Sequence, residues 1–225
     1  MKKINLLAIY TNSYEEIYKK YFLKTLPNEF DSVTVEHILN FDSNPGSVGE
    51  FNFKNINFKK LNLIYKNIKA NLGEILIVSD LDIIFFKEFK EDVLNLLQEN
   101  DILLQDNGNK EYNVGFITIK CTDKVVKFFE EIVIPMSKEI LEGAEISDQG
   151  VLNRSLNLST LRHGYLPKRY WANRIPFNVS GVYGTNLNQC IESIPHDAVL
   201  LHAVAIDGGA EIKKLFFEEV FKQRG

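Results

Sequence analysis

The stretch Ile75-Leu76-Ile77-Val78-Ser79-Asp80-Leu81-Asp82-Ile83-Ile84-Phe85-Phe86 holds two carboxylates between apolar runs. The run at 75–78 is typical of a strand that is buried on both faces, as in a parallel sheet. Asp80 and Asp82 fall where this strand ends, and open α/β sheets bind ligands at that edge. Residues two apart face the same side of an extended chain, so both carboxylates can reach one cation. The pattern favours a metal–diphosphate site, although capping of a turn or pairing with lysines is an alternative for any Asp-x-Asp.

Strands and helices alternate on both sides of this stretch, which predicts an α/β fold with a mostly parallel central sheet flanked by helices. A capping-box pattern at Ser13 and Glu16 predicts the first helix start. Residues 40–55 carry turn-forming residues and are expected to form a long loop. Further strands are expected at 4–10, 33–39, 101–105, 114–120 and 199–201, and further helices at 58–72, 89–97, 125–141 (interrupted at Pro135), 148–156 and 211–222.

The bulk composition excludes several classes of protein. The 225 residues are 45% hydrophobic, which fits one domain spanning residues 1–225. A net charge of -4 without a basic stripe argues against nucleic acid as a partner. Two cysteines, Cys121 and Cys190, are too few for a disulfide framework or a zinc cluster. We find no signal peptide and no apolar run long enough for an integral membrane segment, so we expect a soluble, cytoplasmic protein.

The segment around Asp80 resembles the DxD segment of GT-A fold glycosyltransferases, and most closely that of the nucleotide-diphospho-sugar transferase family. Three further pieces match that family in order, namely Asn113-Val114-Gly115-Phe116, Ser147-Asp148-Gln149 and Leu201-His202-Ala203. The resemblance implies a single Rossmann-like GT-A domain that uses Mn²⁺ or Mg²⁺. It also implies transfer of a sugar from a nucleotide-diphosphate donor, expected to be UDP-linked, to a glycan or other hydroxyl acceptor. The members of closest pattern retain the anomeric configuration.

The resemblance assigns a role to each matched position. Asp80 and Asp82, with Leu81 between them, would face the metal, the ribose and the diphosphate, and His202 would be the third metal ligand. Asn113 would lie near the donor sugar, and Asp148 and Gln149 between the donor sugar and the acceptor. The nucleotide base would lie beside the end of the first strand, at Ala8, Tyr10 and Thr11.

Two of these assignments have alternatives in the sequence. Asp148 and Gln149 begin an expected helix, so Asp148 can be an ordinary N-cap. If they are functional, an acidic side chain can take a proton from the acceptor, or an amide can steady an oxocarbenium-like charge. Among lysines that could reach a diphosphate we select Lys59 and Lys213, each from a consecutive pair with Lys60 or Lys214. For all four, an exposed surface position is the alternative.

Aromatic and basic residues gather in the last third of the chain. They are either an acceptor-side surface or part of the core with a charged rim, and they comprise Tyr165, Tyr170, Trp171, Tyr183, Arg162, Lys168, Arg169 and Arg174.

Three other functions remain open at this point. Phosphatases of the haloacid dehalogenase type also use Asp-x-Asp, but their motif usually lies near the amino terminus. Sugar nucleotidyltransferases often carry a glycine-rich loop after the first strand, where this chain has Thr11-Asn12-Ser13-Tyr14. A non-catalytic module that binds a sugar nucleotide without turnover is the third.

Overall fold

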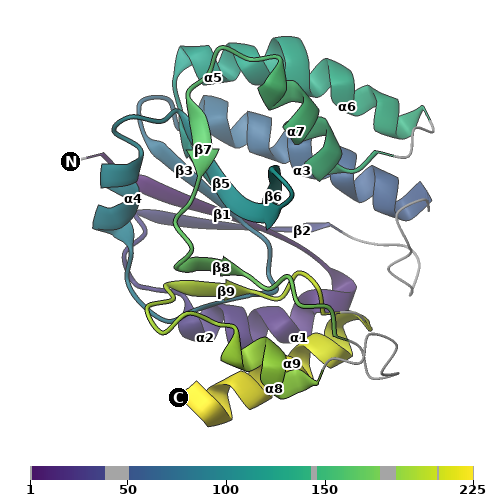
Figure 1. The fold of residues 1–225 in the computed structure, drawn as a ribbon. Helices are drawn as coiled ribbons and strands as arrows, with labels where there is room; N and C mark the ends of the chain where they lie inside the picture. The colour runs from purple at the N-terminus through teal and green to yellow at the C-terminus, as the bar shows by residue number, and fades with distance from the viewer. Residues whose placement is uncertain (1, 39–50, 143–145, 178–185, 207, 225) are drawn as a thin grey trace.

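A six-stranded sheet forms the centre of the protein in the computed structural model, which describes residues 2–38, 51–142, 146–177, 186–206 and 208–224 (Figure 1). The strand order is β2-β1-β3-β6-β5-β7, and only β6 runs antiparallel to its neighbours. The expected α/β class with a mostly parallel sheet is confirmed. The strands are β1 (Ile4–Thr11), β2 (Ser32–Ile38), β3 (Ile75–Ser79), β5 (Ile102–Gly108), β6 (Glu111–Lys120) and β7 (His163–Tyr165).

A second, three-stranded sheet lies below the first in Figure 1, in the order β4-β9-β8. It consists of β4 (Ile83–Phe85), β8 (Tyr170–Ala172) and β9 (Leu200–His202). Because β4 starts directly after Asp82 and pairs Ile83 with His202, this sheet brings the late histidine beside the carboxylate stretch.

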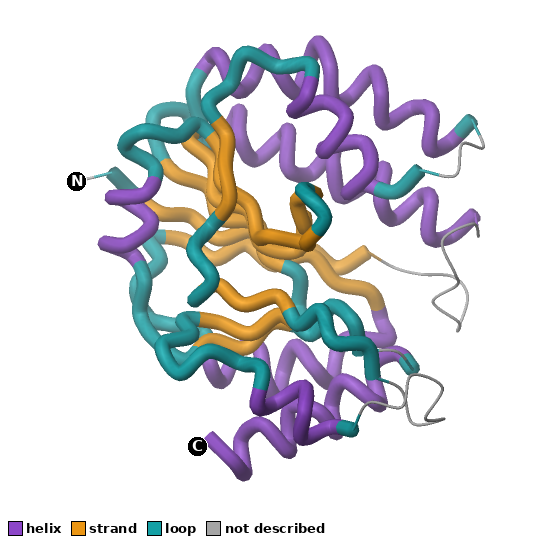
Figure 2. Tube along the Cα trace, viewed as in Figure 1, coloured by secondary structure: helices purple, strands orange, loops and turns teal. Residues whose placement is uncertain are grey.

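Helices cover both faces of this arrangement (Figure 2). Above the central sheet lie α3 (Phe51–Ala70), α5 (Asp123–Phe128), the π-helical turn η3 (Phe129–Val133), α6 (Ile134–Leu141) and α7 (Asp148–Asn157). On the side of the small sheet lie the 3₁₀ turn η1 (Asn12–Tyr14), α1 (Glu15–Ile17), the π-helical turn η2 (Tyr18–Phe22), α2 (Leu23–Thr25), α8 (Leu187–Glu192) and α9 (Gly209–Arg224). The remaining helix, α4 (Lys90–Leu96), lies at one end of the sheet.

Three apolar clusters join these layers. One lies between the central sheet and the helices above it, one on the opposite face of that sheet, and one between the small sheet and α9. The continuous apolar run of β3 is buried along its whole length, as expected for the centre of a sheet covered on both faces.

Of three local expectations, two failed, at Ser13 and at the end of the loop expected at 40–55. The capping box at Ser13 does not form, because the chain enters η1 first and Glu16 pairs instead with Lys20 and Lys214. The helix expected at 125–141 is indeed interrupted next to Pro135, because α5 ends at Phe128, the π-helical turn η3 follows, and Pro135 lies at the start of α6. The end of the expected loop at 40–55 is helical from Phe51 on, and its part at 40–50 lies outside the described residues.

Two further expectations concerned the aromatic and basic residues in the last third of the chain and the absence of a membrane segment. Tyr183 also lies outside the described residues. None of the helices in the described part of the chain is long and apolar enough to cross a membrane.

Candidate active site

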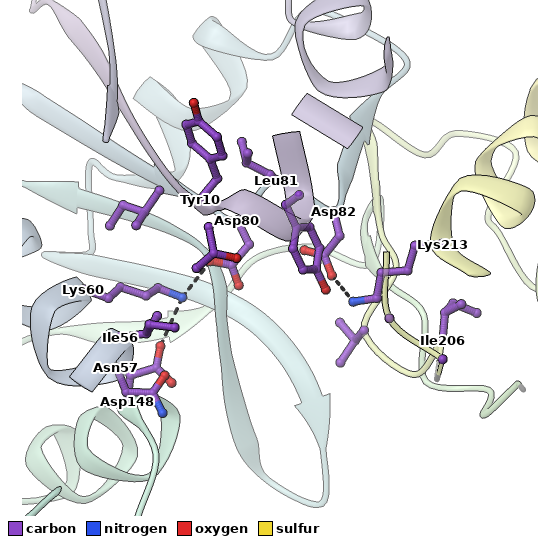
Figure 3. A pocket seen from close by; sticks show the side chains of 16 residues that line it. Tyr10, Ile56, Asn57, Lys60, Asp80, Leu81, Asp82, Asp148, Ile206 and Lys213 are labelled. Carbon is purple, nitrogen blue, oxygen red and sulfur yellow. Dashed lines mark hydrogen bonds and ion pairs between the residues drawn. The ribbon is translucent and has the colours of Figure 1, made fainter. Parts of the chain in front are cut away.

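A cleft of about 450 Å³ opens at the carboxyl-terminal edge of the parallel strands. Its lining comes from the end of β1, from one face of α3, from the loop after β3, from the start of α7 and from residues 204–213 (Figure 3). Ligands of open α/β sheets bind at this edge, so the position alone makes the cleft the candidate active site.

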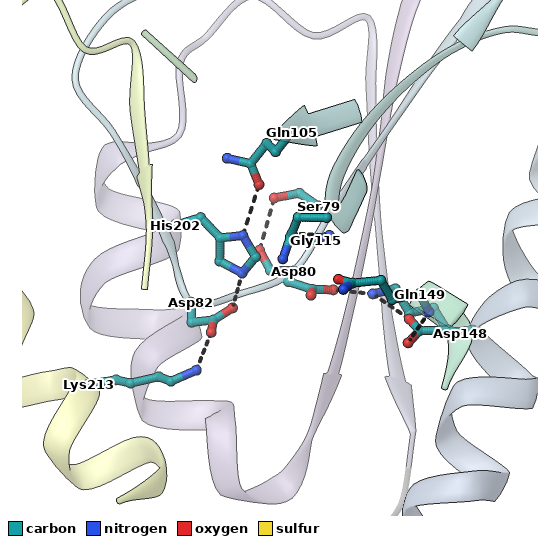
Figure 4. Close-up of polar contacts among 11 residues, drawn as sticks. Ser79, Asp80, Asp82, Gln105, Gly115, Asp148, Gln149, His202 and Lys213 are labelled. Atoms are coloured by element: carbon teal, nitrogen blue, oxygen red, sulfur yellow. Dashed lines mark hydrogen bonds and ion pairs between the residues drawn. The ribbon is translucent and has the colours of Figure 1, made fainter. Parts of the chain in front are cut away.

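Asp82 stands at the centre of one charged group. Lys213 donates to its Oδ2, and Nε2 of His202 lies 3.3 Å from its Oδ1 (Figure 4). All three side chains are nearly buried. Burial opposes the charge on Asp82, but Lys213 and His202 outweigh it and hold the pKa of this carboxyl well below its usual range.

The orientation of His202 is fixed from behind by Gln105. The amide of Gln105 donates its Nε2 to the carbonyl of Tyr170 at 3.2 Å, so its Oε1 faces Nδ1 of His202 at 2.9 Å. An amide oxygen only accepts, so Nδ1 of His202 donates to it. Nε2 is then left to face Oδ1 of Asp82 at 3.3 Å, where a proton or a cation between the two atoms would satisfy both.

Asp80 belongs to a second charged group, built around Lys60 of α3. The Lys60 ammonium lies 2.7 Å from Oδ1 of Asp80 and 3.1 Å from Oδ2 of Asp148. Burial works against the charge on Lys60, but the two carboxylates prevail and raise the pKa of its ammonium. Burial raises the pKa of Asp80, against the opposing effect of Lys60.

The Asn-x-Gly segment of β6 supports both groups rather than lining the cleft. The carbonyl of Gly115 accepts from the backbone N–H of Asp80 at 2.7 Å, and Oδ1 of Asn113 accepts from the N–H of Gly115 at 2.9 Å. A Cβ on Gly115 would lie 1.9 Å from Cε1 of His202. Only glycine at this position leaves room for the imidazole.

The start of α7 brings Asp148 into the cleft. Ser147, not Asp148, is the N-cap, since its hydroxyl accepts from the N–H of Gly150 at 3.2 Å. Interpreting Asp148 as an ordinary N-cap is therefore wrong. Gln149 follows it and is half-buried, outside the lining of the cleft.

The other candidate residues divide into two sets. Tyr10, Thr11, Leu81 and Lys213 line the cleft. Ala8 does not, because it is fully buried in the core beneath β1.

The structure corrects the choice of Lys59 as a lysine that reaches a diphosphate. It is exposed and does not line the cleft, whereas its neighbour Lys60 is buried there between two carboxylates. Sequence analysis also missed Tyr14, Asn57 and Gln105. The helical period is the signal for Asn57 and Lys60, since they share the face of α3 that carries Leu61, Ile64 and Ile68.

Asp80, Asp82 and His202 together form a group that could hold a metal ion. Each offers one ligand atom, and these atoms all lie within 4.8 Å of one another. Two carboxylates are the kind of ligand that Mg²⁺ and Mn²⁺ prefer, and an imidazole can complete the set.

Comparisons with known proteins agree with this geometry. Residues 26–216 match the family model described as nucleotide-diphospho-sugar transferase. No curated protein sequence matches the chain.

Solved structures share the fold at low sequence identity. The glycosyltransferase GlyE of Streptococcus pneumoniae TIGR4 is 16% identical with a TM-score of 0.58, over 98% of this chain and 60% of that one. This chain thus spans 60% of the length of GlyE. A glycosyltransferase involved in glycosylation of the major capsid of PBCV-1 is 10% identical with a TM-score of 0.63, over 96% and 99%. The galactosyltransferase LgtC, solved with donor and acceptor sugar analogs, is 11% identical with a TM-score of 0.50, over 97% and 95%.

Proposed function

Since the chain belongs to the nucleotide-diphospho-sugar transferase family and is therefore a glycosyltransferase with the GT-A fold, we propose that it transfers a sugar from a UDP-linked donor to a hydroxyl acceptor with the help of a divalent cation. The main support for this proposal is that Asp80, Asp82 and His202 lie close together beside the cleft. Lys213 lines the same cleft. The haloacid dehalogenase-type phosphatase and the sugar nucleotidyltransferase are not favoured, because the family match is to neither.

Asp80, Asp82 and His202 would hold Mn²⁺ or Mg²⁺. The fit is supported by the position of Nε2 of His202, which faces Oδ1 of Asp82 at 3.3 Å, so that one cation can contact both atoms. When bound, the cation supplies positive charge that stabilises a departing nucleoside diphosphate. Gln105 holds the imidazole from behind, as outer-shell partners of metal-binding histidines commonly do.

The diphosphate would lie between the carboxylate stretch and the start of α9. Gly208 and Gly209 line the cleft there with φ values of 108° and 72°, where α9 begins. A helix N-terminus attracts anions, and the nearby ammonium of Lys213 adds a full charge. The base and ribose would then lie toward Tyr10 and Thr11 at the end of β1.

The donor sugar and the acceptor would meet near Asp148 and Gln149. Either Asp148 accepts the proton of the acceptor hydroxyl, or the Gln149 amide steadies the positive charge that develops at the anomeric carbon. Asn113 would act as a positioning residue, because its side chain holds the backbone of Gly115. We also propose that the anomeric configuration is retained, and the family resemblance is the support for this.

We also propose that residues 1–225 work as one transferase domain, since the family match extends over 26–216.

The proposed sugar transfer is tested by isothermal titration of UDP into the protein with Mn²⁺, and again with EDTA. We expect binding that requires the metal and that Asp82→Asn abolishes, while Asp123→Asn, an exposed aspartate on α5, leaves it unchanged. Absence of UDP binding under both conditions would contradict the proposal.

A further inference from the structure

One polar side chain of the cleft has a hydrogen-bonding atom without a partner. Asn57 of α3 is 5% exposed and lines the cleft, and its Nδ2 is buried without an acceptor. Four other buried side-chain atoms in the described residues share this property, but none belongs to a residue that lines the cleft. Buried polar groups are nearly always hydrogen-bonded, so an orphan donor at a cleft suggests a ligand as its partner.

The neighbours of Asn57 indicate what kind of ligand this is. Asn57 lies three residues before Lys60, so the two side chains lie on the same face of α3. Lys60 in turn contacts Asp80 and Asp148. Figure 3 shows Asn57, Lys60 and Asp148 gathered on one side of the cleft, with Lys213 on the other. An amide, an ammonium and two carboxylates together offer both donors and acceptors, which suits a ligand rich in hydroxyl groups.

The position of this polar wall fits one part of a sugar nucleotide. Under the proposed function, the diphosphate takes the side of Lys213 and Gly208, and the nucleoside takes the end of β1. The remaining wall, at Asn57 and Lys60, then faces the donor sugar. The last torsion of an asparagine side chain is broad, so its amide can turn the N–H toward a bound hydroxyl.

We propose that Asn57 binds a hydroxyl group of the donor sugar and thereby selects which sugars the enzyme accepts. This inference rests on the proposed function and adds to it a specificity residue. A donor that lacks the contacted hydroxyl leaves the amide unsatisfied, and sites built to hydrogen-bond a substrate hydroxyl discriminate strongly against such analogues.

The test compares binding of UDP with binding of UDP-sugars by isothermal titration in Mn²⁺. The panel is UDP-glucose, UDP-galactose and UDP-N-acetylglucosamine, and the tightest-binding member serves as the probe. We expect Asn57→Ala to weaken binding of that UDP-sugar about tenfold, the size of one hydrogen bond, and to leave UDP binding unchanged. Asn62→Ala is the matched control, because Asn62 lies on the same helix and donates to the carbonyl of Phe58 at 2.9 Å.

A second variant separates recognition from a structural role. Asn57→Leu keeps the side-chain volume and removes the orphan donor, so we expect the ligand-free protein to unfold at the same or a higher temperature while binding of the UDP-sugar weakens. Equal weakening of UDP and UDP-sugar, or a lower unfolding temperature, overturns the inference, as does unchanged binding of the UDP-sugar. Wild-type protein that binds neither UDP nor any UDP-sugar overturns the proposed function itself.

Discussion

Two carboxylates only two residues apart have entirely different partners in this protein. Asp80 pairs with Lys60 and Asp82 with Lys213 and His202. Each lysine comes from a different element, so the strand end is held between α3 and α9. A bound cation would compete with these lysines for the carboxylates, and Lys213 would then be free to pair with a phosphate.

Removing one of these carboxylates tests the metal site. We expect Asp82→Asn to lower metal-dependent release of UDP from a UDP-sugar by at least about 100-fold, because an amide is a much poorer ligand for a hard cation. The fold should persist, as judged by circular dichroism. Activity equal to that of the wild type in this variant would contradict the assignment of Asp82.

Gly115 provides a test of the imidazole position. Its substitution by alanine would place a methyl group on the ring of His202, and we expect the ring to be displaced and metal-dependent UDP binding to be lost. Gly164→Ala in β7, which pairs with β5 and not with β6, is the control, since a Cβ there meets atoms at 3.5 and 3.7 Å. Both variants should be compared by titration of UDP with Mn²⁺. Equal binding by both would mean that Gly115 has no special role.

At the scale of elements, patterns of period and length predicted the long strands and helices well. The apolar run at 75–78 became β3, which is buried along its whole length. The alternation at 33–39 became β2, although only Ile38 of that strand is buried and Val33 is exposed. The strands β4, β8 and β9 have three residues each, too few to show any period, and only β9 was expected, from the apolar run at 199–201. Local patterns do not show which strands pair, so they could not place His202 beside Asp82.

On α3 as well, the local pattern was predictable from the sequence but the contacts with distant residues were not. A period of 3.6 residues predicted the buried face that contains Leu61 and Ile64, and this face also includes Lys60. The choice of Lys59 as a diphosphate-binding residue did not use this period. Lys60 stays buried because it pairs with Asp80 and Asp148. This pairing can be recognised only once the fold is known.

The N-cap of α7 offers a test at this scale. Ser147→Ala should lower the free energy of unfolding by about 1 kcal/mol and also reduce turnover, because the cap fixes the first turn that carries Asp148. Thr122→Ala removes the corresponding cap of α5, which lies away from the cleft, and should lower stability similarly without changing turnover. Thermal unfolding and UDP release measure the two effects. Equal turnover in both variants would show that the first turn of α7 is not critical.

For the whole molecule, Asp101 links pH to stability. Its carboxylate accepts from the N–H of Arg162 at 2.8 Å and from Lys124 at 3.3 Å. Burial opposes its charge, but these two contacts prevail and lower the pKa of the carboxyl. A depressed native pKa adds stability above the unfolded value, and that stability is lost as the pH falls.

The unfolding temperature should therefore stay level near neutral pH and fall below about pH 4, the unfolded pKa of aspartate. The Asp101→Asn variant should be less stable than the wild type at neutral pH, and the difference should shrink in acid. Calorimetry in EDTA across this range measures both curves. A difference that stays constant from pH 7 to about pH 3 would contradict the role given to Asp101.

For the whole protein, the proposed function requires glycosyl transfer from a nucleotide donor in this one cleft. The most direct measurement is the release of UDP from a panel of UDP-sugars by wild-type protein, in Mn²⁺ and in EDTA, beside the double variant Asp80→Asn, Asp82→Asn. The account predicts release that requires the metal and that the double variant lacks. Release by the double variant, or no release from any UDP-sugar while UDP itself binds, would contradict it.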